Sequence, residues 1–242
     1  MMNLFKKVEN FMVILLTMTS GCADAISFLA LGQVLTAAMT GNTVFLGLSI
    51  IHADGLKPIG YIVALSGFIL GVAAGAFIVK KKRHITGLNP IVTITLCLEL
   101  FALVLFGILS TCFNASDGLV LILLLSFAMG VQGVTARRIG VNGVPTTVIT
   151  STTTGLIESL IWNIKRDAIT PSVPSSSIFI WIFDIIIYCV GAAICGAVEL
   201  RWHLNAVWLP AAIVLIVALT SFFFQLQNQQ KNKVKSENSI GI

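Results

Sequence analysis

Several uncharged apolar runs in this sequence reach the length that crosses a lipid bilayer. A spanning helix needs about 20 predominantly apolar residues, and residues 59–79 and 118–136 are two such runs. Only 10% of the 242 residues are charged, whereas a soluble domain carries about a quarter. The sequence therefore predicts an all-α integral membrane protein that crosses the bilayer several times.

The charged residues and cysteines argue against other classes of protein. The formal net charge is +5, but the basic residues form short clusters between apolar runs, which is typical of cytoplasmic loops rather than of nucleic-acid binding. The five cysteines form no C-x-x-C pair, and we interpret them as buried apolar side chains. The sequence contains no phosphate-binding loop, catalytic nucleophile motif or cluster of metal ligands. We therefore predict no enzyme activity, no catalytic residues, no cofactor and no metal site.

The sequence contains eight candidate membrane segments, and two of them are unusually polar. They cover residues 11–31, 34–51, 59–79, 90–109, 118–136, 144–164, 178–200 and 207–224. The second and sixth segments are rich in threonine. The first segment holds small and polar residues around Gly21 and is expected to bend or break there. Residues 1–10 are expected to form a cytoplasmic N-terminus, and residues 225–242 a disordered polar tail.

The two polar segments resemble each other, and so do their flanks. Threonines stand four residues apart in both, as Thr36 and Thr40 and as Thr146 and Thr150. Further matches, in the same order along the chain, are Gly21 with Gly130, Gly71 with Gly191, and Leu88-Asn89 with Leu204-Asn205. Ordered matches of this kind predict an internal duplication, with a first repeat over residues 11–111 and a second over residues 112–224.

The distribution of lysine and arginine indicates how the segments are threaded. If all eight segments cross the membrane, eight basic residues fall on one side and seven on the other. If the second and sixth segments enter and leave on the same side, thirteen fall on one side and only Lys57 and Arg201 on the other. Because cytoplasmic loops carry the excess of basic residues, the second arrangement is favoured. It has six full spans, two polar re-entrant or broken segments, and cytoplasmic termini.

This arrangement makes the two halves inverted, as in many transporters. The sixth segment supports it, because a stretch with so many hydroxyl side chains suits the lining of a cavity better than contact with lipid. Threonine can, however, return its hydroxyl to the helix backbone, so eight full spans remain the alternative.

With these residues in view, the chain resembles the YoaK family of bacterial membrane proteins. The resemblance covers about residues 10–225 and rests on Gly21-x-x-Asp24-Ala25, Gly32, Met39-Thr40-Gly41-Asn42, Met129-Gly130-x-Gln132, Arg138 and Pro145-Thr146-Thr147 with Thr150. In the second half, Ser151 and Gly133 depart from the pattern, which has glycine and asparagine there. The resemblance implies a multi-pass protein of the bacterial inner membrane, and it implies no particular substrate.

Asp24 is the first candidate for a functional residue. A carboxylate inside a membrane segment is costly and by default marks a proton or ion site. The alternative is a capping role, in which the side chain accepts hydrogen bonds from local backbone N–H groups. Gln132 lies near the corresponding position of the second half, where a polar partner could face it.

Other side chains of the two polar segments are candidates for a solute or ion pathway. Hydroxyl, amide and exposed carbonyl oxygens are the usual neutral ligands in such pathways, and a glycine allows a close approach. The candidates are Thr36, Thr40, Gly41, Asn42, Thr146, Thr150 and Thr152, and Arg138, between the fifth and sixth segments, is a further candidate. The alternative is that these groups only form hydrogen bonds between helices.

Two further acids, Glu99 and Asp184, lie in otherwise apolar spans. Each is a candidate for proton coupling, and each could instead pair with an arginine such as Arg138. Glu158 is closer to the end of its segment and is expected at the membrane interface.

These features predict a small inner-membrane transporter or channel for a small solute, proton or cation. Its pathway would lie between the two threonine-rich segments, with Asp24 as the coupling or gating acid. The alternative is a membrane scaffold or accessory subunit that transports nothing. The lipid bilayer and the solute are the expected partners, and the sequence is compatible with an oligomer of identical chains.

Overall fold

The computed structural model describes residues 2–53, 55–80, 89–112, 118–139, 153–158, 161 and 175–240. Within this part of the chain the regular structure is entirely helical. The elements are α1 (Met2–Ala30), α2 (Met39–Ile50), α3 (Pro58–Lys80), α4 (Pro90–Cys112), α5 (Leu119–Ile139), α7 (Ser175–Trp202), the 3-10 helix η2 (His203–Val207) and α8 (Trp208–Ile240). Residues 153–158 form a further short helical stretch.

Five stretches of the described chain are long and apolar enough to cross a membrane. Four of them, α1, α3, α4 and α5, are single apolar stretches, and a fifth stretch, Phe179–Gln227, comprises α7, η2 and α8. By contrast, α2 has 12 residues. At 1.5 Å per residue it covers about 18 Å, which is well short of the roughly 30 Å hydrocarbon core. The predicted all-α fold of a membrane protein that crosses the bilayer several times is therefore confirmed.

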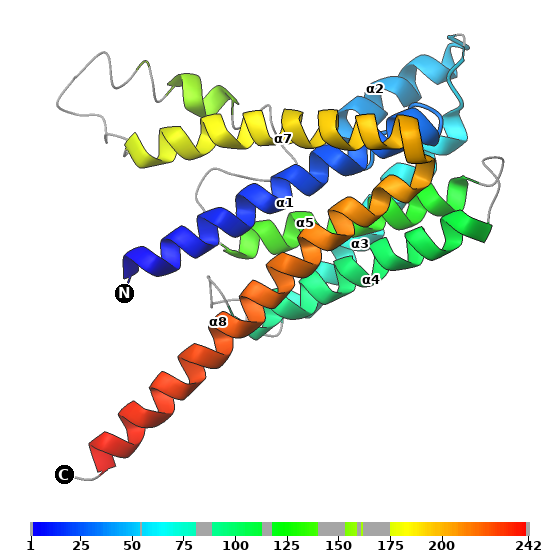
Figure 1. The fold of residues 1–242 in the computed structure, drawn as a ribbon. Helices are drawn as coiled ribbons and strands as arrows, with labels where there is room; N and C mark the ends of the chain where they lie inside the picture. The colour runs from blue at the N-terminus through cyan, green and yellow to red at the C-terminus, as the bar shows by residue number, and fades with distance from the viewer. Residues whose placement is uncertain are drawn as a thin grey trace.

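The directions of the helices show how α2 is threaded. The two chain termini lie at the same end of the helix bundle, where α3 and α5 finish and α4 and α7 start (Figure 1). At the opposite end, α1 is connected to α3 through α2, so α2 leaves and returns on one side. Residues 153–158 lie beside the beginning of α7 (Figure 1), where a Cβ built on Gly155 would be 3.6 Å from the Trp181 ring. The two short helices thus sit at opposite ends, as in inverted halves.

Two helix pairs make the closest contacts in the bundle, and both are built around glycines. Helix α1 packs along α7, and α3 packs along α5. A Cβ on Gly21 would lie 2.2 Å from the carbonyl oxygen of Tyr188, and one on Gly130 would lie 2.3 Å from that of Phe68. Tyr188 and Phe68 each stand three residues before a glycine of the matched pair Gly191 and Gly71. The two interfaces are therefore equivalent residue by residue, as two related halves require.

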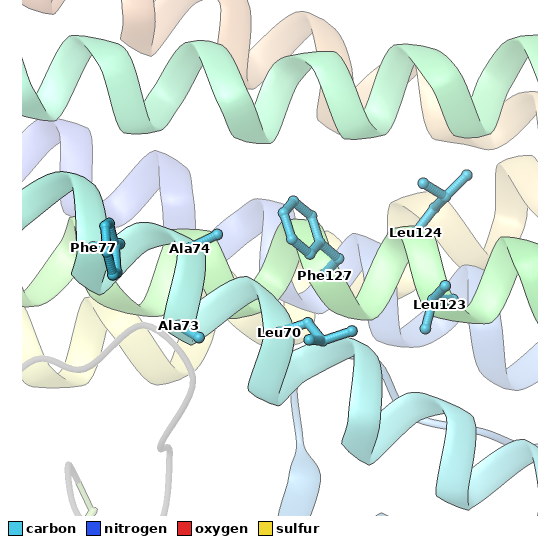
Figure 2. A pocket seen from close by; sticks show the side chains of 7 residues that line it. All are labelled: Leu70, Ala73, Ala74, Phe77, Leu123, Leu124 and Phe127. Carbon is cyan, nitrogen blue, oxygen red and sulfur yellow. The ribbon is translucent and has the colours of Figure 1, made fainter.

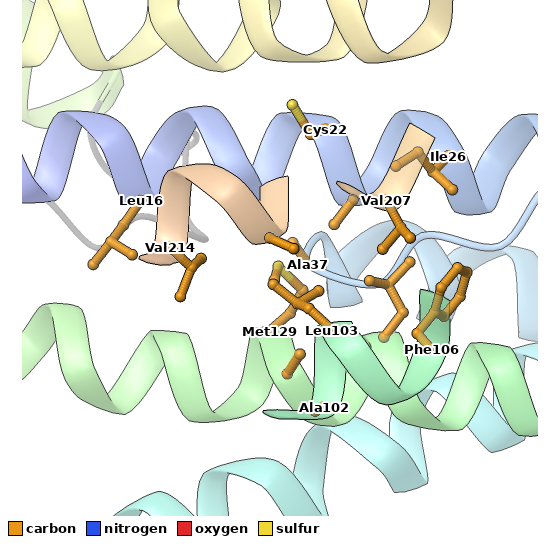
Figure 3. Close-up of a cluster of buried hydrophobic side chains, with 14 of the residues drawn as sticks. Leu16, Cys22, Ile26, Ala37, Ala102, Leu103, Phe106, Met129, Val207 and Val214 are labelled. Carbon is orange, nitrogen blue, oxygen red and sulfur yellow. The ribbon is translucent and has the colours of Figure 1, made fainter. Parts of the chain in front are cut away.

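An apolar core fills the space between these pairs. Leu16, Leu103 and Met129 are fully buried and come from α1, α4 and α5 (Figure 3). Ala37, which lies between α1 and α2, is only 2% exposed and sits among them (Figure 3). The chain between α1 and α2 therefore reaches into the bundle, although it does not cross it.

Three local expectations are corrected by the structure. Helix α1 is continuous from Met2 to Ala30, so the predicted break at Gly21 is wrong: this glycine serves the close contact with α7, not a bend. Thr36 precedes α2, so it does not share a helix with Thr40. The predicted tail from residue 225 continues α8 as far as Ile240. The side chain of Gln225 anchors this extension, because it donates hydrogen bonds to the Asn89 carbonyl (2.8 Å) and to Thr93 Oγ1 (2.6 Å) at the start of α4.

Candidate functional site

The carboxylate of Asp24 organises the chain between α1 and α2. Its Oδ1 accepts hydrogen bonds from the backbone N–H groups of Thr36 (2.7 Å) and Ala37 (2.6 Å). Its Oδ2 accepts one from the N–H of Ala38 at 3.2 Å and another from the hydroxyl of Tyr188 on α7. These N–H groups precede the first turn of α2, where a negative charge is favoured. Asp24 therefore caps a neighbouring helix and ties α1, α2 and α7 together.

Asn42 closes the same loop from the other side. Its Oδ1 accepts a hydrogen bond from the Leu35 N–H at 2.9 Å, and its Nδ2 donates to the Leu35 carbonyl. The side chain is fully buried, so both halves of its amide are used. A Cβ on Gly41 would lie 2.6 Å from the Leu35 side chain. The Gly-Asn pair thus fixes the backbone that Asp24 caps.

A second polar cluster lies at the middle of the bundle and is centred on Gln132 of α5. Its Oε1 accepts a hydrogen bond from Ser20 Oγ at 2.6 Å. Its Nε2 donates to Glu99 Oε1 on α4 at 2.9 Å and to Thr19 Oγ1 on α1. All four side chains are fully buried. Gln132 therefore joins α1 and α4 through α5, and it places an acid in the centre of the membrane domain.

A third acid, Asp184 of α7, lies on the other side of α1. Its Oδ1 accepts a hydrogen bond from Thr17, and both side chains are fully buried. Its Oδ2, like Oε2 of Glu99, has no hydrogen-bond partner in the described part of the chain. Within that part, Asp24, Glu99 and Asp184 form no pair with a lysine or an arginine. The expected pairing of Glu99 or Asp184 with Arg138 is therefore not observed.

The equivalent interface between α3 and α5 lacks the acid and the tyrosine. Counting back from the matched glycines, Ala64 of α3 takes the place of Asp184, and Phe68 takes that of Tyr188. Ser126 of α5 takes the place of Thr17, and its buried hydroxyl has no partner among the described residues. Since α3 and α5 pack as closely as α1 and α7 do, Asp184 is not needed for packing at the α1–α7 interface.

The structure brings some of the predicted site residues together and separates others. Asp24, Thr36 and Asn42 meet in the capped loop, and Gln132 meets Glu99. Thr40 is exposed on the outer side of α2, and Glu158 is also exposed. Thr146, Thr150 and Thr152 lie outside the described residues.

Sequence reasoning assigned no functional role to Thr17, Thr19, Ser20, Tyr188 or the buried Glu199. Thr17, Thr19 and Ser20 lie close together within the apolar first segment, and that polar run was the signal that could have found them. It was interpreted instead as the cause of a bend. Tyr188 is a single aromatic residue in the middle of an apolar segment, and Glu199 stands near the end of the same segment, so neither gives a comparable signal.

An apolar groove runs between α3 and α5 on the outside of the bundle and has a volume of about 560 Å³. It is lined by Leu70, Ala73, Ala74, Phe77, Leu123, Leu124 and Phe127 (Figure 2). None of these side chains offers a hydrogen-bonding group, so the groove suits an acyl chain and not a polar solute.

Comparison with known proteins agrees with a membrane fold of this kind. Residues 12–220 match a family model described as "Protein of unknown function (DUF1275)". The chain is 33% identical over 218 residues to the UPF0700 transmembrane protein YoaK of Bacillus subtilis (strain 168), covering 88% of this chain and 94% of that protein. No solved structure matches the chain. The protein is therefore a transmembrane member of the DUF1275 family, and it is similar to YoaK.

Proposed function

We propose that this protein is a small transporter that moves a small polar solute or ion across the cell membrane. The pathway follows α1. Asp184 lies on one side of this helix, and Glu99 with Gln132 lies on its other side. The observation that carries the proposal is the difference between the two equivalent interfaces. A buried acid is costly in a membrane, and the α3–α5 interface packs without one. Asp184 is therefore best explained by a function.

The inverted arrangement of the halves supports the same proposal. Transporters with inverted repeats place solute and ion sites near the middle of the membrane, where short or broken helices meet. Here the loop before α2 enters the bundle, and Asp24 holds it in place through three backbone N–H groups. In this proposal the loop before α2 is the gate at one end of α1, and Asp24 holds it closed.

The basic residues orient the protein in the membrane. Lys6, Arg137 and Arg138 lie at the end of the bundle that carries both termini, whereas Lys57 and Arg201 lie at the opposite end. Because loops on the cytoplasmic side carry the excess of lysine and arginine, we place both termini in the cytoplasm and the capped loop on the outer side.

The experiment uses purified protein in liposomes on a solid-supported membrane, exposed in turn to a panel of small polar solutes. The matched variant carries Thr17→Ser and Asp184→Ala. These changes copy Ser126 and Ala64, which occupy the equivalent positions at the α3–α5 interface. We expect at least one solute to produce a transport current in the wild type and none in the variant. The unfolding temperature of the variant should stay within about 3 °C of wild type, because its packing is that of the other interface.

Two results would contradict this proposal. A current that the double variant retains at full size would place the pathway away from the α1–α7 interface. The absence of any current in the wild type, across the whole panel and with an imposed proton gradient, would favour a scaffold.

A further inference from the structure

The cluster around Gln132 leaves one oxygen atom in an unusual position. Glu99 is fully buried near the middle of α4, and its Oε2 has no hydrogen-bond partner among the described residues. We propose that Glu99 is a proton-binding site, with the proton carried on Oε2 and with Gln132, Thr19 and Ser20 holding the carboxyl group in place. This inference rests on the proposed function and names the coupled ion.

The hydrogen bonds of the cluster fix which atoms donate. Thr19 uses its one hydroxyl hydrogen for the Leu16 carbonyl at 2.7 Å, so the atom of Gln132 that faces Thr19 has to be a donor. That atom is Nε2, whose second hydrogen points to Glu99 Oε1 at 2.9 Å. The amide oxygen then faces Ser20, which donates to it at 2.6 Å. Glu99 Oε1 is therefore an acceptor, and Oε2 is the free position.

The assignment of donors and acceptors around Glu99 also favours a proton over a metal ion at this position. A metal ion needs several oxygen ligands pointing at one centre, whereas the Gln132 group beside Glu99 is an N–H donor. No group of three or more His, Cys, Asp or Glu side chains that could hold a metal occurs in the part of the chain that the structure describes. Binding adds one proton from water to Oε2 and neutralises the carboxylate, and release returns the proton to water.

Among the side chains that the structure describes, no charged group bonds to Glu99. The titratable or charged side chains that the structure describes on the elements packed against α4 are Tyr61 on α3, Arg137 and Arg138 on α5, and His203 in η2. On α1, Asp24 makes its own four hydrogen bonds. The polar partner that Glu99 does have is the neutral Gln132. Its charge is therefore offset by no cation, and a proton is what can neutralise it.

Three other buried acids differ from Glu99 in ways that make the assignment specific. Glu199 also has an oxygen without a partner in the described part of the chain, but it lies close to the end of α7. Both oxygens of Asp24 accept hydrogen bonds, four in total, so it has no free position for a proton. Asp184 has one free oxygen, but its hydrogen-bond partner among the described residues is Thr17 alone. Glu99 is linked through Gln132 to α1 and α5, so binding of a proton to Glu99 can affect helices of both halves of the bundle.

The test is infrared difference spectroscopy of the full-length protein in lipid, recorded between acidic and alkaline pH. A protonated carboxylic acid has a C=O stretching band that an ionised carboxylate lacks. We expect this band in the wild type, its loss in Glu99→Gln, and its retention in Asp184→Asn, which is the matched control. Gln132→Met keeps the volume and removes the hydrogen bond to Oε1, so the band should move to higher frequency. That variant keeps the test decisive if Glu99→Gln does not fold.

Several outcomes would overturn the assignment. A band that persists in Glu99→Gln, or that disappears in Asp184→Asn instead, would place the proton elsewhere. A band unmoved in Gln132→Met would do the same. Because the measurement follows protonation and not transport, it can succeed or fail independently of the solute currents.

Discussion

Asp24→Ala should leave little folded protein in the membrane. The substitution removes the acceptor for three backbone N–H groups and for the hydroxyl of Tyr188. Thr36 and Ala37 stay buried, so their N–H groups cannot turn to water. Each buried donor left without a partner costs about 1–3 kcal/mol, and the sum approaches the 5–15 kcal/mol that typically holds a protein together.

Asp24→Asn should have a smaller effect. The amide oxygen can still accept from Thr36 and Ala37, but the charge is lost and an NH2 group faces the N–H of Ala38. We expect a loss of about 2 kcal/mol, since hydrogen bonds to charged groups are worth about 1.5–3 kcal/mol and neutral ones about 0.5–1.5. This corresponds to a fall of about 4–8 °C in unfolding temperature. Tyr188→Phe, which removes one of the four donors, is the control and should cost least.

The measurement is thermal unfolding of the three purified variants beside the wild type, followed by loss of the monodisperse peak. The predicted order of stability is wild type, Tyr188→Phe, Asp24→Asn and Asp24→Ala. If Asp24→Ala unfolded at the wild-type temperature, the carboxylate would not be what holds the loop before α2.

Gly71→Ala should be the second severe substitution. A Cβ at this position would lie 2.1 Å from the carbonyl oxygen of Phe127, and a backbone atom cannot move aside as the end of a flexible side chain can. Helices α3 and α5 would have to separate, and overpacking of this kind costs about 1–3 kcal/mol or more. Gly191→Ala should be similarly harmful, because its Cβ would lie 2.4 Å from the Met18 carbonyl oxygen at the equivalent interface.

Gly47→Ala provides the control for this prediction. It is also a helical glycine, but nothing lies within 4 Å of the added Cβ, and alanine favours a helix by about 1 kcal/mol. Its unfolding temperature should equal or exceed that of the wild type, whereas Gly71→Ala and Gly191→Ala should fall by similar amounts. A normal unfolding temperature for either of those two would mean that the helices do not pack through their glycines.

Much of the fold could be predicted because the bilayer imposes simple requirements on a sequence. Length and the absence of charge identify the spans, and the count of basic residues indicates that residues 34–51 do not cross. The matches of Gly21 with Gly130 and of Gly71 with Gly191 also identified the residues at the two closest helix contacts. What the pattern could not show is that these glycines meet across the halves, since packing partners depend on three-dimensional arrangement.

The site was harder to predict for a related reason. A lone aspartate in an apolar run indicates that burying its carboxylate costs free energy. The partners of Asp24, however, are backbone N–H groups more than ten residues away and Tyr188 in the other half. Sequence spacing cannot show such contacts. Thr19 and Ser20 were noticed only as polar residues in a helix, because their role depends on Gln132 of α5.

Opposite orientation of the two halves is the claim on which the proposed pathway depends. It is tested most directly by reporter fusions placed after Arg83 and after Arg166, in a reporter that is active on one side of the membrane only. If segments 34–51 and 144–164 both fail to cross, the two fusions should report the cytoplasm, as should a fusion at the C-terminus. Fusions after Arg83 and Arg166 that report opposite sides would contradict the inverted arrangement and favour eight full spans.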